Sequence, residues 1–110
     1  MALNFEKYTY RVTWSEEDEE FVGLCSELPS LSWLDATSEK TLKGIHLVVE
    51  KCLEDMLQNG EEIPLPISLR DYSGKFMVRI PPEVHRHLAL EAIEAGVSLN
   101  RIASSKLAHY

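Results

Sequence analysis

The spacing of hydrophobic residues changes along the chain, and each change predicts a new structural element. The segments 8–14 and 21–25 are short and rich in aromatic and β-branched residues, which is typical of strands. The polar run 15–20 between them suits a hairpin tip, and residues 31–34 follow a Pro-Ser turn as a third short strand. The pattern predicts a three-stranded antiparallel meander.

The segment after the third strand has the spacing of a helix. Thr37 suits an N-cap and Glu39 suits the first turn, where the helix dipole favours an acidic side chain. Apolar residues then recur at intervals of three and four, at Leu42, Ile45, Val49, Cys52 and Met56. Asn59 and Gly60 end the pattern. We predict an amphipathic helix whose wide apolar face covers one side of the sheet.

Two prolines characterise the segment 61–73 that follows. Pro64 and Pro66 exclude a helix and favour extended chain. The alternation of Ile63, Leu65, Ile67 and Leu69 makes part of this segment a candidate for an additional strand at the sheet edge.

The last third of the chain predicts a strand and two helices. In residues 75–80, one side would carry Phe76, Val78 and Ile80, and the other Lys75, Met77 and Arg79. Pro82 fits the first turn of a helix whose apolar row is Val84, Leu88, Ala92 and Ala95, with Ile93 beside it. Gly96 fits the end of that helix, and Ser98 caps a second helix with the stripe Leu99, Ile102, Ala103 and Leu107.

A strand and two helices in fewer than forty residues are too small to bury a core alone. Two copies that pair their strands would solve this problem, with a dimer core of Phe76, Val78, Ile80, Val84, Leu88 and Ile102. The paired ribbon would present Lys75, Met77 and Arg79 to a DNA major groove. The amides near Ser98, Leu99 and Asn100 form a natural phosphate site. The alternative is a plain strand and helical hairpin that only dimerise.

Charge separates the two parts of the chain. The 110 residues carry a net charge of −7. Residues 1–73 hold six Lys and Arg against fifteen Asp and Glu, a net −9, whereas residues 74–110 hold five against three, a net +2. The first part should therefore attract a basic protein, and the second can approach a phosphate backbone.

Other chemistry is weakly represented. Cys25 and Cys52 lack metal-ligand or redox spacing, so we interpret them as free thiols of a cytosolic protein. The start of the chain has no signal-peptide pattern, and no apolar run is long enough for a membrane span. The four histidines do not form a metal-binding pattern, and we find no catalytic triad or cofactor motif. Trp14 and Trp33 are interpreted as packing residues on neighbouring strands, with a partner-facing role for one of them as the alternative.

The acidic run 16–20 is the one candidate for a metal-dependent nuclease centre. Neighbouring side chains of a strand point to opposite faces, so these five acids cannot converge on one ion. We interpret the run as a solvated hairpin tip that helps to attract a basic partner.

Two stretches of the chain resemble known families. Residues 8–66 resemble the N-terminal domain of HicB antitoxins through the motifs FVGL, ELP, DATSE and NGEEIPLP. Residues 74–107 resemble a ribbon-helix-helix domain of the MetJ/Arc type, and the join YSGKFMVRIPPEVH is similar to that of HicB proteins with this tail. The chain has Pro29-Ser30-Leu31 where the family often has a Pro-Gly turn.

The resemblance implies an α+β fold in two domains. Residues 1–66 would be a small antiparallel sheet with one packed helix, a partial RNase H-like fold, followed by a connector at 67–73. Residues 74–110 would be the ribbon-helix-helix. Within it, Lys75, Met77 and Arg79 match the groove-facing strand positions, and Ser98, Leu99 and Asn100 match the phosphate-contacting helix start.

The implied function is that of a cytoplasmic type II antitoxin without enzymatic activity or cofactor. Its front domain would neutralise a HicA-type mRNA-cleaving toxin. Its tail would bind operator DNA as a homodimer, with a tetramer left open, and repress its own operon. Two other hypotheses are a solitary DNA-binding regulator and an RNase H-like enzyme.

Overall fold

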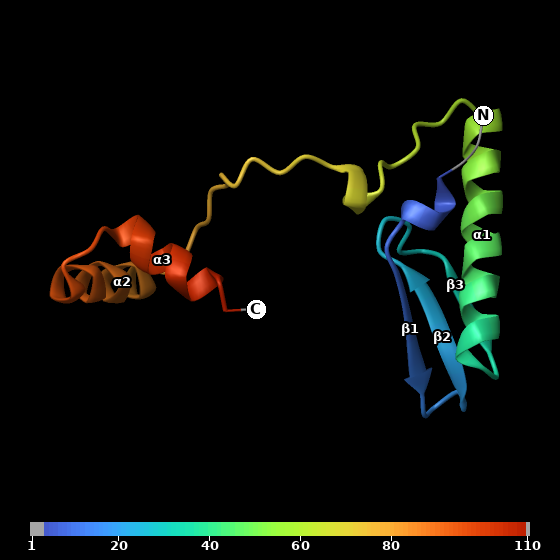
Figure 1. Cartoon of the computed structure of the whole chain (residues 1–110), viewed down its shortest axis with the longest axis horizontal. Helices are drawn as coiled ribbons and strands as arrows, with labels where there is room; N and C mark the ends of the chain where they lie inside the picture. The colour runs from blue at the N-terminus through green and yellow to red at the C-terminus, as the bar shows by residue number, and fades with distance from the viewer. Residues whose placement is uncertain (1–3, 110) are drawn as a thin grey trace. The chain divides into compact units, whose positions relative to one another are not determined.

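The computed structural model describes residues 4–109, and the chain divides into two compact units between Tyr72 and Ser73 (Figure 1). The first unit is an antiparallel sheet in the order β1-β2-β3, with one long helix packed on it. Its elements are the 3-10 turn η1 (Phe5–Lys7), β1 (Tyr10–Ser15), β2 (Glu20–Cys25), β3 (Ser32–Asp35), α1 (Ser38–Gln58) and the 3-10 turn η2 (Ile67–Leu69). The second unit contains α2 (Pro82–Ala95) and α3 (Leu99–Leu107). The predicted α+β class and the meander are confirmed.

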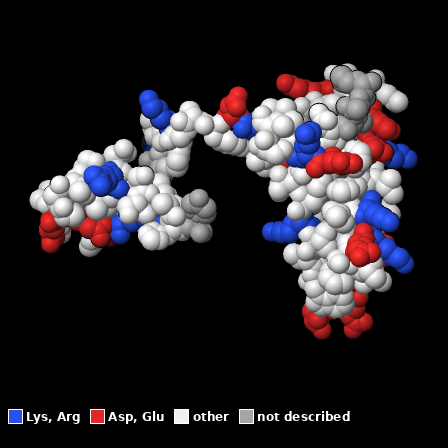
Figure 2. Space-filling view, in the orientation of Figure 1, with Lys and Arg blue, Asp and Glu red and all other residues white. Residues whose placement is uncertain are grey.

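The hairpin between β1 and β2 carries the acidic run at its tip. Ser15 pairs with Glu20, and the residues between them form the turn, in which Glu19 has a φ of +53°. The Ser15 hydroxyl donates to Asp18 over 2.9 Å, and the Trp14 indole donates to Glu16 over 2.6 Å. Figure 2 shows acidic side chains gathered at this end of the unit. At least two of the five acids therefore serve the turn itself.

Local capping signals set both ends of α1. The Thr37 side chain accepts a hydrogen bond from the Lys40 amide, and this bond satisfies a first-turn donor as predicted. At the other end, the Asn59 amide donates to the Asp55 carbonyl over 3.0 Å, and Gly60 takes a positive φ of 72°. The predicted start and end of this helix are confirmed.

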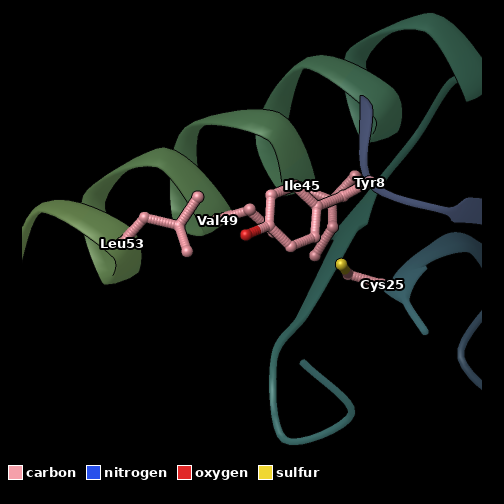
Figure 3. Packing of buried hydrophobic residues seen from close by; sticks show 5 residues of the cluster. All are labelled: Tyr8, Cys25, Ile45, Val49 and Leu53. Atoms are coloured by element: carbon pink, nitrogen blue, oxygen red, sulfur yellow. The ribbon is translucent and has the colours of Figure 1, made fainter. Parts of the chain in front are cut away.

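The core of the first unit lies between α1 and the sheet. Ile45, Val49 and Leu53 of α1 are almost fully buried and point toward Tyr8 and Cys25 (Figure 3). Thr41, one turn before Ile45, is buried as well, and its hydroxyl donates to the Thr37 carbonyl over 2.7 Å.

The predicted apolar stripe of α1 is therefore wider than the buried one. Leu42 remains 39% exposed, and Cys52 and Met56 are only partly buried. The physical reason is the narrow sheet, because three strands cover little more than the single helical row at Thr41, Ile45, Val49 and Leu53.

A close approach between β3 and α1 requires a glycine in the helix. The Trp33 indole lies directly over Gly44, so that a Cβ added at Gly44 would fall 2.0 Å from the indole nitrogen. Gly23 of β2 makes a similar but looser approach to the helix at Thr41 and Ile45. The helix packs tightly on the sheet because both of these residues lack a side chain.

Replacing Gly44 with Ala is expected to destabilise the first unit by about 1–3 kcal/mol, because Trp33 must move out of its place. Helix propensity alone predicts the opposite, a gain of about 1 kcal/mol. Urea unfolding followed by tryptophan emission measures the difference, and Lys43→Ala, at an exposed position of the same helix, is the control. A Gly44→Ala protein as stable as the parent would show that Trp33 does not constrain the helix.

The expectation that part of the segment 61–73, called the connector from here on, adds a strand to the sheet was wrong. Residues 61–73 contain no strand, and residues 67–69 form η2 instead. Pro64 and Pro66 have no amide to donate to a neighbouring strand. The Tyr8 hydroxyl donates to the Pro64 carbonyl over 2.5 Å, and the Ser68 hydroxyl donates to the Lys7 carbonyl over 2.7 Å. Part of the predicted connector is thus attached to the first unit.

Both tail helices begin where the sequence predicts, and the first also ends there. α2 starts at Pro82 and ends before Gly96, which has a φ of +68°, and the Val97 amide donates back to the Ala92 carbonyl over 3.0 Å. The Ser98 side chain accepts from the Arg101 amide over 3.1 Å and caps α3. Between residues 4 and 109, none of the helices has the length and apolar character needed to cross a membrane.

Candidate nucleic-acid interface

Residues 75–80, the predicted DNA-reading strand, have no strand pairing in the single chain. Figure 1 shows an extended trace here that leads into α2. A strand needs the hydrogen bonds of a neighbour, and the second unit otherwise consists of two helices and their connections. The predicted strand is therefore absent from the monomer, where the segment has no partner.

Apolar side chains of this segment are strongly exposed. Phe76 is 73% exposed and Val78 is 57% exposed, and Ile80 and Val84 are also exposed. Among residues 73–109 only Ala92 is buried. Burial of each large apolar side chain contributes about 1.5–3 kcal/mol, so a single second unit leaves most of its available hydrophobic stabilisation unused.

A groove of about 590 Å³ runs along α2 beside Lys106 of α3. Its lining includes Val84 and Leu88, two of the predicted dimer-core residues. Sequence reasoning did not assign the other lining residues, which are His87, Leu90, Glu91, Glu94 and Lys106. Glu91 and Lys106 form an ion pair of 3.1 Å that joins α2 to α3. This pair has no signal in the sequence, because its members lie on different helices.

The three predicted base-contacting side chains are all accessible. Met77 is 89% exposed, and Lys75 and Arg79 are exposed on either side of it. They alternate with Phe76, Val78 and Ile80, so pairing as a strand would separate the two sets onto opposite faces.

The predicted phosphate site lies at the start of α3. The Ser98 hydroxyl already accepts from the Arg101 amide. Leu99 and Asn100 open the helix, where first-turn amides have no partner inside the helix and favour an anion. A phosphate would therefore bind the amides of Leu99 and Asn100, while the Ser98 hydroxyl caps the helix.

Other candidate residues have packing roles. The His46 ring lies edge-on to Tyr10 and Phe5, with centroid separations of 4.4 and 5.5 Å. Trp14 packs edge-on to Phe21 with a centroid separation of 5.1 Å, although its side chain is half exposed. Within the part of the chain that the structure describes, no three His, Cys, Asp or Glu side chains come together to hold a metal ion.

Residues 58–107 match the model of the HicB family. The HicB match begins at the last residue of α1, continues through the connector and ends with α3. Strands β1, β2 and β3 lie outside the matched range. No curated protein and no solved structure matches the chain.

Proposed function

We propose that the chain is a type II antitoxin of the HicB kind with two binding surfaces. The first unit binds and neutralises a HicA-type mRNA interferase, and the second binds operator DNA as a homodimer and represses its own operon. The observation that carries this proposal is the HicB match, which covers the connector and both tail helices. The protein acts in the cytoplasm, without cofactor or catalysis of its own.

The exposed apolar surface of the second unit supports dimerisation. Two copies that pair residues 75–80 antiparallel form a two-stranded ribbon. Phe76, Val78 and Ile80 then face the helices, together with Val84, Leu88 and Ile102. The ribbon-helix-helix formed in this way buries side chains that are exposed in one copy.

The same pairing orders the DNA-reading surface. Lys75, Met77 and Arg79 lie on the outer face of the ribbon, and a DNA major groove admits a two-stranded ribbon. Arg79 and Lys75 can donate to guanine, and the Met77 side chain can contact a thymine methyl group. The amides at the start of α3 bind the phosphate backbone on either side.

Charge and exposed aromatic surface support a basic partner for the first unit. Its sequence, residues 1–73, carries a net −9, and five of its acids lie together at 16–20. The half-exposed Trp14 lies next to this tip. An acidic surface steers a basic RNA-binding toxin into an encounter, and the bound first unit then covers the RNA-binding and catalytic surface of the toxin.

The limited range of the match favours one alternative function. Because β1, β2 and β3 lie outside it, the first unit of a solitary ribbon-helix-helix regulator could respond to something other than a toxin. Such a regulator would bind DNA through the same three residues of each copy, Lys75, Met77 and Arg79, but would neutralise no toxin.

Co-expression with a short basic reading frame adjacent to the gene tests the proposal. We expect the full chain to restore growth when that frame is induced, and the two proteins to copurify. Growth arrest despite a soluble, folded chain would favour the solitary regulator. Cation-dependent RNA cleavage by the purified chain alone would favour the nuclease hypothesis instead.

A further inference from the structure

The Glu27 carboxylate joins three separate parts of the first unit. It accepts from the Thr9 amide over 2.9 Å and from the Thr9 hydroxyl over 3.0 Å, just before β1. It also accepts from the Ile67 amide over 2.8 Å, forty residues along the chain at the start of η2. The sulfur atom of Cys25, at the end of β2, lies 3.6 Å from a carboxylate oxygen of Glu27. One charged group thus receives donors from the residue before β1, from the end of β2 and from the connector.

Neighbouring contacts hold the same stretch of connector. Ser68 donates to the Lys7 carbonyl, Tyr8 donates to the Pro64 carbonyl, and Pro66 is buried. These hydrogen bonds are between neutral groups, whereas the bond from Ile67 to Glu27 is charge-assisted and therefore stronger. On the far side of Ile67, the Arg70 amide donates to the Ile67 carbonyl over 3.1 Å and closes the turn η2.

Electrostatics agree with this geometry. Partial burial raises the pKa of Glu27, but hydrogen bonds from the Ile67 and Thr9 amides lower it more, so that the pKa lies below its usual range. The carboxylate is therefore ionised at neutral pH, and its ionised form is the one that the attached connector stabilises.

We propose that Glu27 is a latch that holds the connector on the first unit and sets the length of the free tether to the second. With the latch closed, the tether before the ribbon comprises residues 71–74, which span at most roughly 14 Å. Release of residues 64–70 would lengthen it to roughly 38 Å. The latch thus determines the largest distance between a partner bound to the first unit and the second unit. This inference does not depend on the proposed antitoxin function.

Tryptic cleavage after Arg70 in the full-length protein measures the state of the latch. Arg70 is exposed, but a protease needs several extended residues around the cleaved bond, so η2 must open before it can act. When opening is fast, the cleavage rate follows the population of the open form. We expect Glu27→Gln to speed cleavage after Arg70 roughly fivefold to tenfold, because the charge-assisted acceptor is lost.

A matched control removes one negative charge without touching the latch. Glu62→Gln changes an exposed residue of the same segment and should leave the cleavage rate as in the parent. Tryptophan emission reports whether the first unit remains folded, because Trp14 and Trp33 lie on the strands and not in the connector. Equal cleavage of the Glu27→Gln and Glu62→Gln proteins, both folded, would overturn the proposal.

A second variant keeps the test decisive if Glu27→Gln unfolds the first unit. Ile67→Pro deletes the connector's amide donor, together with a side chain that is already 37% exposed, and leaves Glu27 bonded to Thr9. Pro66 already has an extended conformation, with φ −55° and ψ 139°, which a following proline accepts. Faster cleavage after Arg70 with unchanged tryptophan emission would support the latch, and an unchanged cleavage rate would overturn it.

Discussion

Val78→Glu is expected to leave the protein monomeric and unable to bind DNA. In the proposed ribbon Val78 of each copy faces the helices, whereas in the single chain its side chain is 57% exposed. The substitution would place two carboxylates inside one small dimer core, where burial of each unpaired charge costs several kcal/mol. We expect the dimer dissociation constant to rise by at least about 100-fold, which corresponds to about 2.7 kcal/mol. Sedimentation velocity across a concentration series measures it.

Met77→Glu is the matched control, because it places the same charge one residue away. Met77 is 89% exposed and belongs to the outer face of the ribbon. The Met77→Glu protein should remain a dimer and lose only its affinity for DNA, since the new carboxylate would meet the negatively charged duplex. A dimeric Val78→Glu protein would refute the proposed dimer core. A monomeric Met77→Glu protein would show that the two faces of the segment are exchanged.

Short-range signals explain why much of the fold could be predicted from the sequence. Thr37 and Ser98 each accept a bond from an amide three residues later, and Gly96 allows the left-handed turn between α2 and α3. Such features depend on a few neighbouring residues, so that their residue types suffice to recognise them. Both ends of α1 and α2 and the start of α3 therefore follow the prediction closely.

Contacts between distant residues explain what could not be predicted. The alternation at Ile63, Leu65 and Ile67 favours a strand, but Glu27 binds the Ile67 amide from forty residues away. The buried row of α1 includes Thr41 instead of Leu42, because the width of the sheet determines which residues are covered. Neither effect can be recognised in a local window of sequence.

The candidate site depends on a partner that a single chain does not contain. Residues 75–80 have the alternation of a strand, yet strand pairing requires a second copy, so their assignment to DNA bases and dimer core stays a prediction. The groove along α2 was missed because Leu90 lies outside the predicted apolar row and Glu91 pairs with Lys106 of the next helix.

Arg79→Ala is expected to weaken binding to DNA from upstream of the gene by roughly 5-fold to 150-fold, or about 1–3 kcal/mol, if Arg79 makes a bidentate contact to guanine. The loss should be specific for sequence, whereas removal of a phosphate contact weakens binding to every duplex about equally. Gel shifts at one fixed salt concentration, with the upstream DNA and a scrambled duplex of the same length, separate the two effects. Arg79→Lys keeps the charge but not the planar fork of donors, and should recover only the part of the affinity that is independent of sequence.

Arg86→Ala supplies the matched control, because Arg86 is an exposed arginine of α2 outside the ribbon. It should preserve the ratio between the affinities for upstream and scrambled DNA. Unchanged affinity of the Arg79→Ala protein would remove Arg79 from the DNA-reading surface. The Arg79→Ala protein should also still neutralise the toxin in the growth assay, because the first unit performs that task. If a folded Arg79→Ala protein failed to restore growth, the two binding functions could not belong to separate units, and the tail would have to contact the toxin as well.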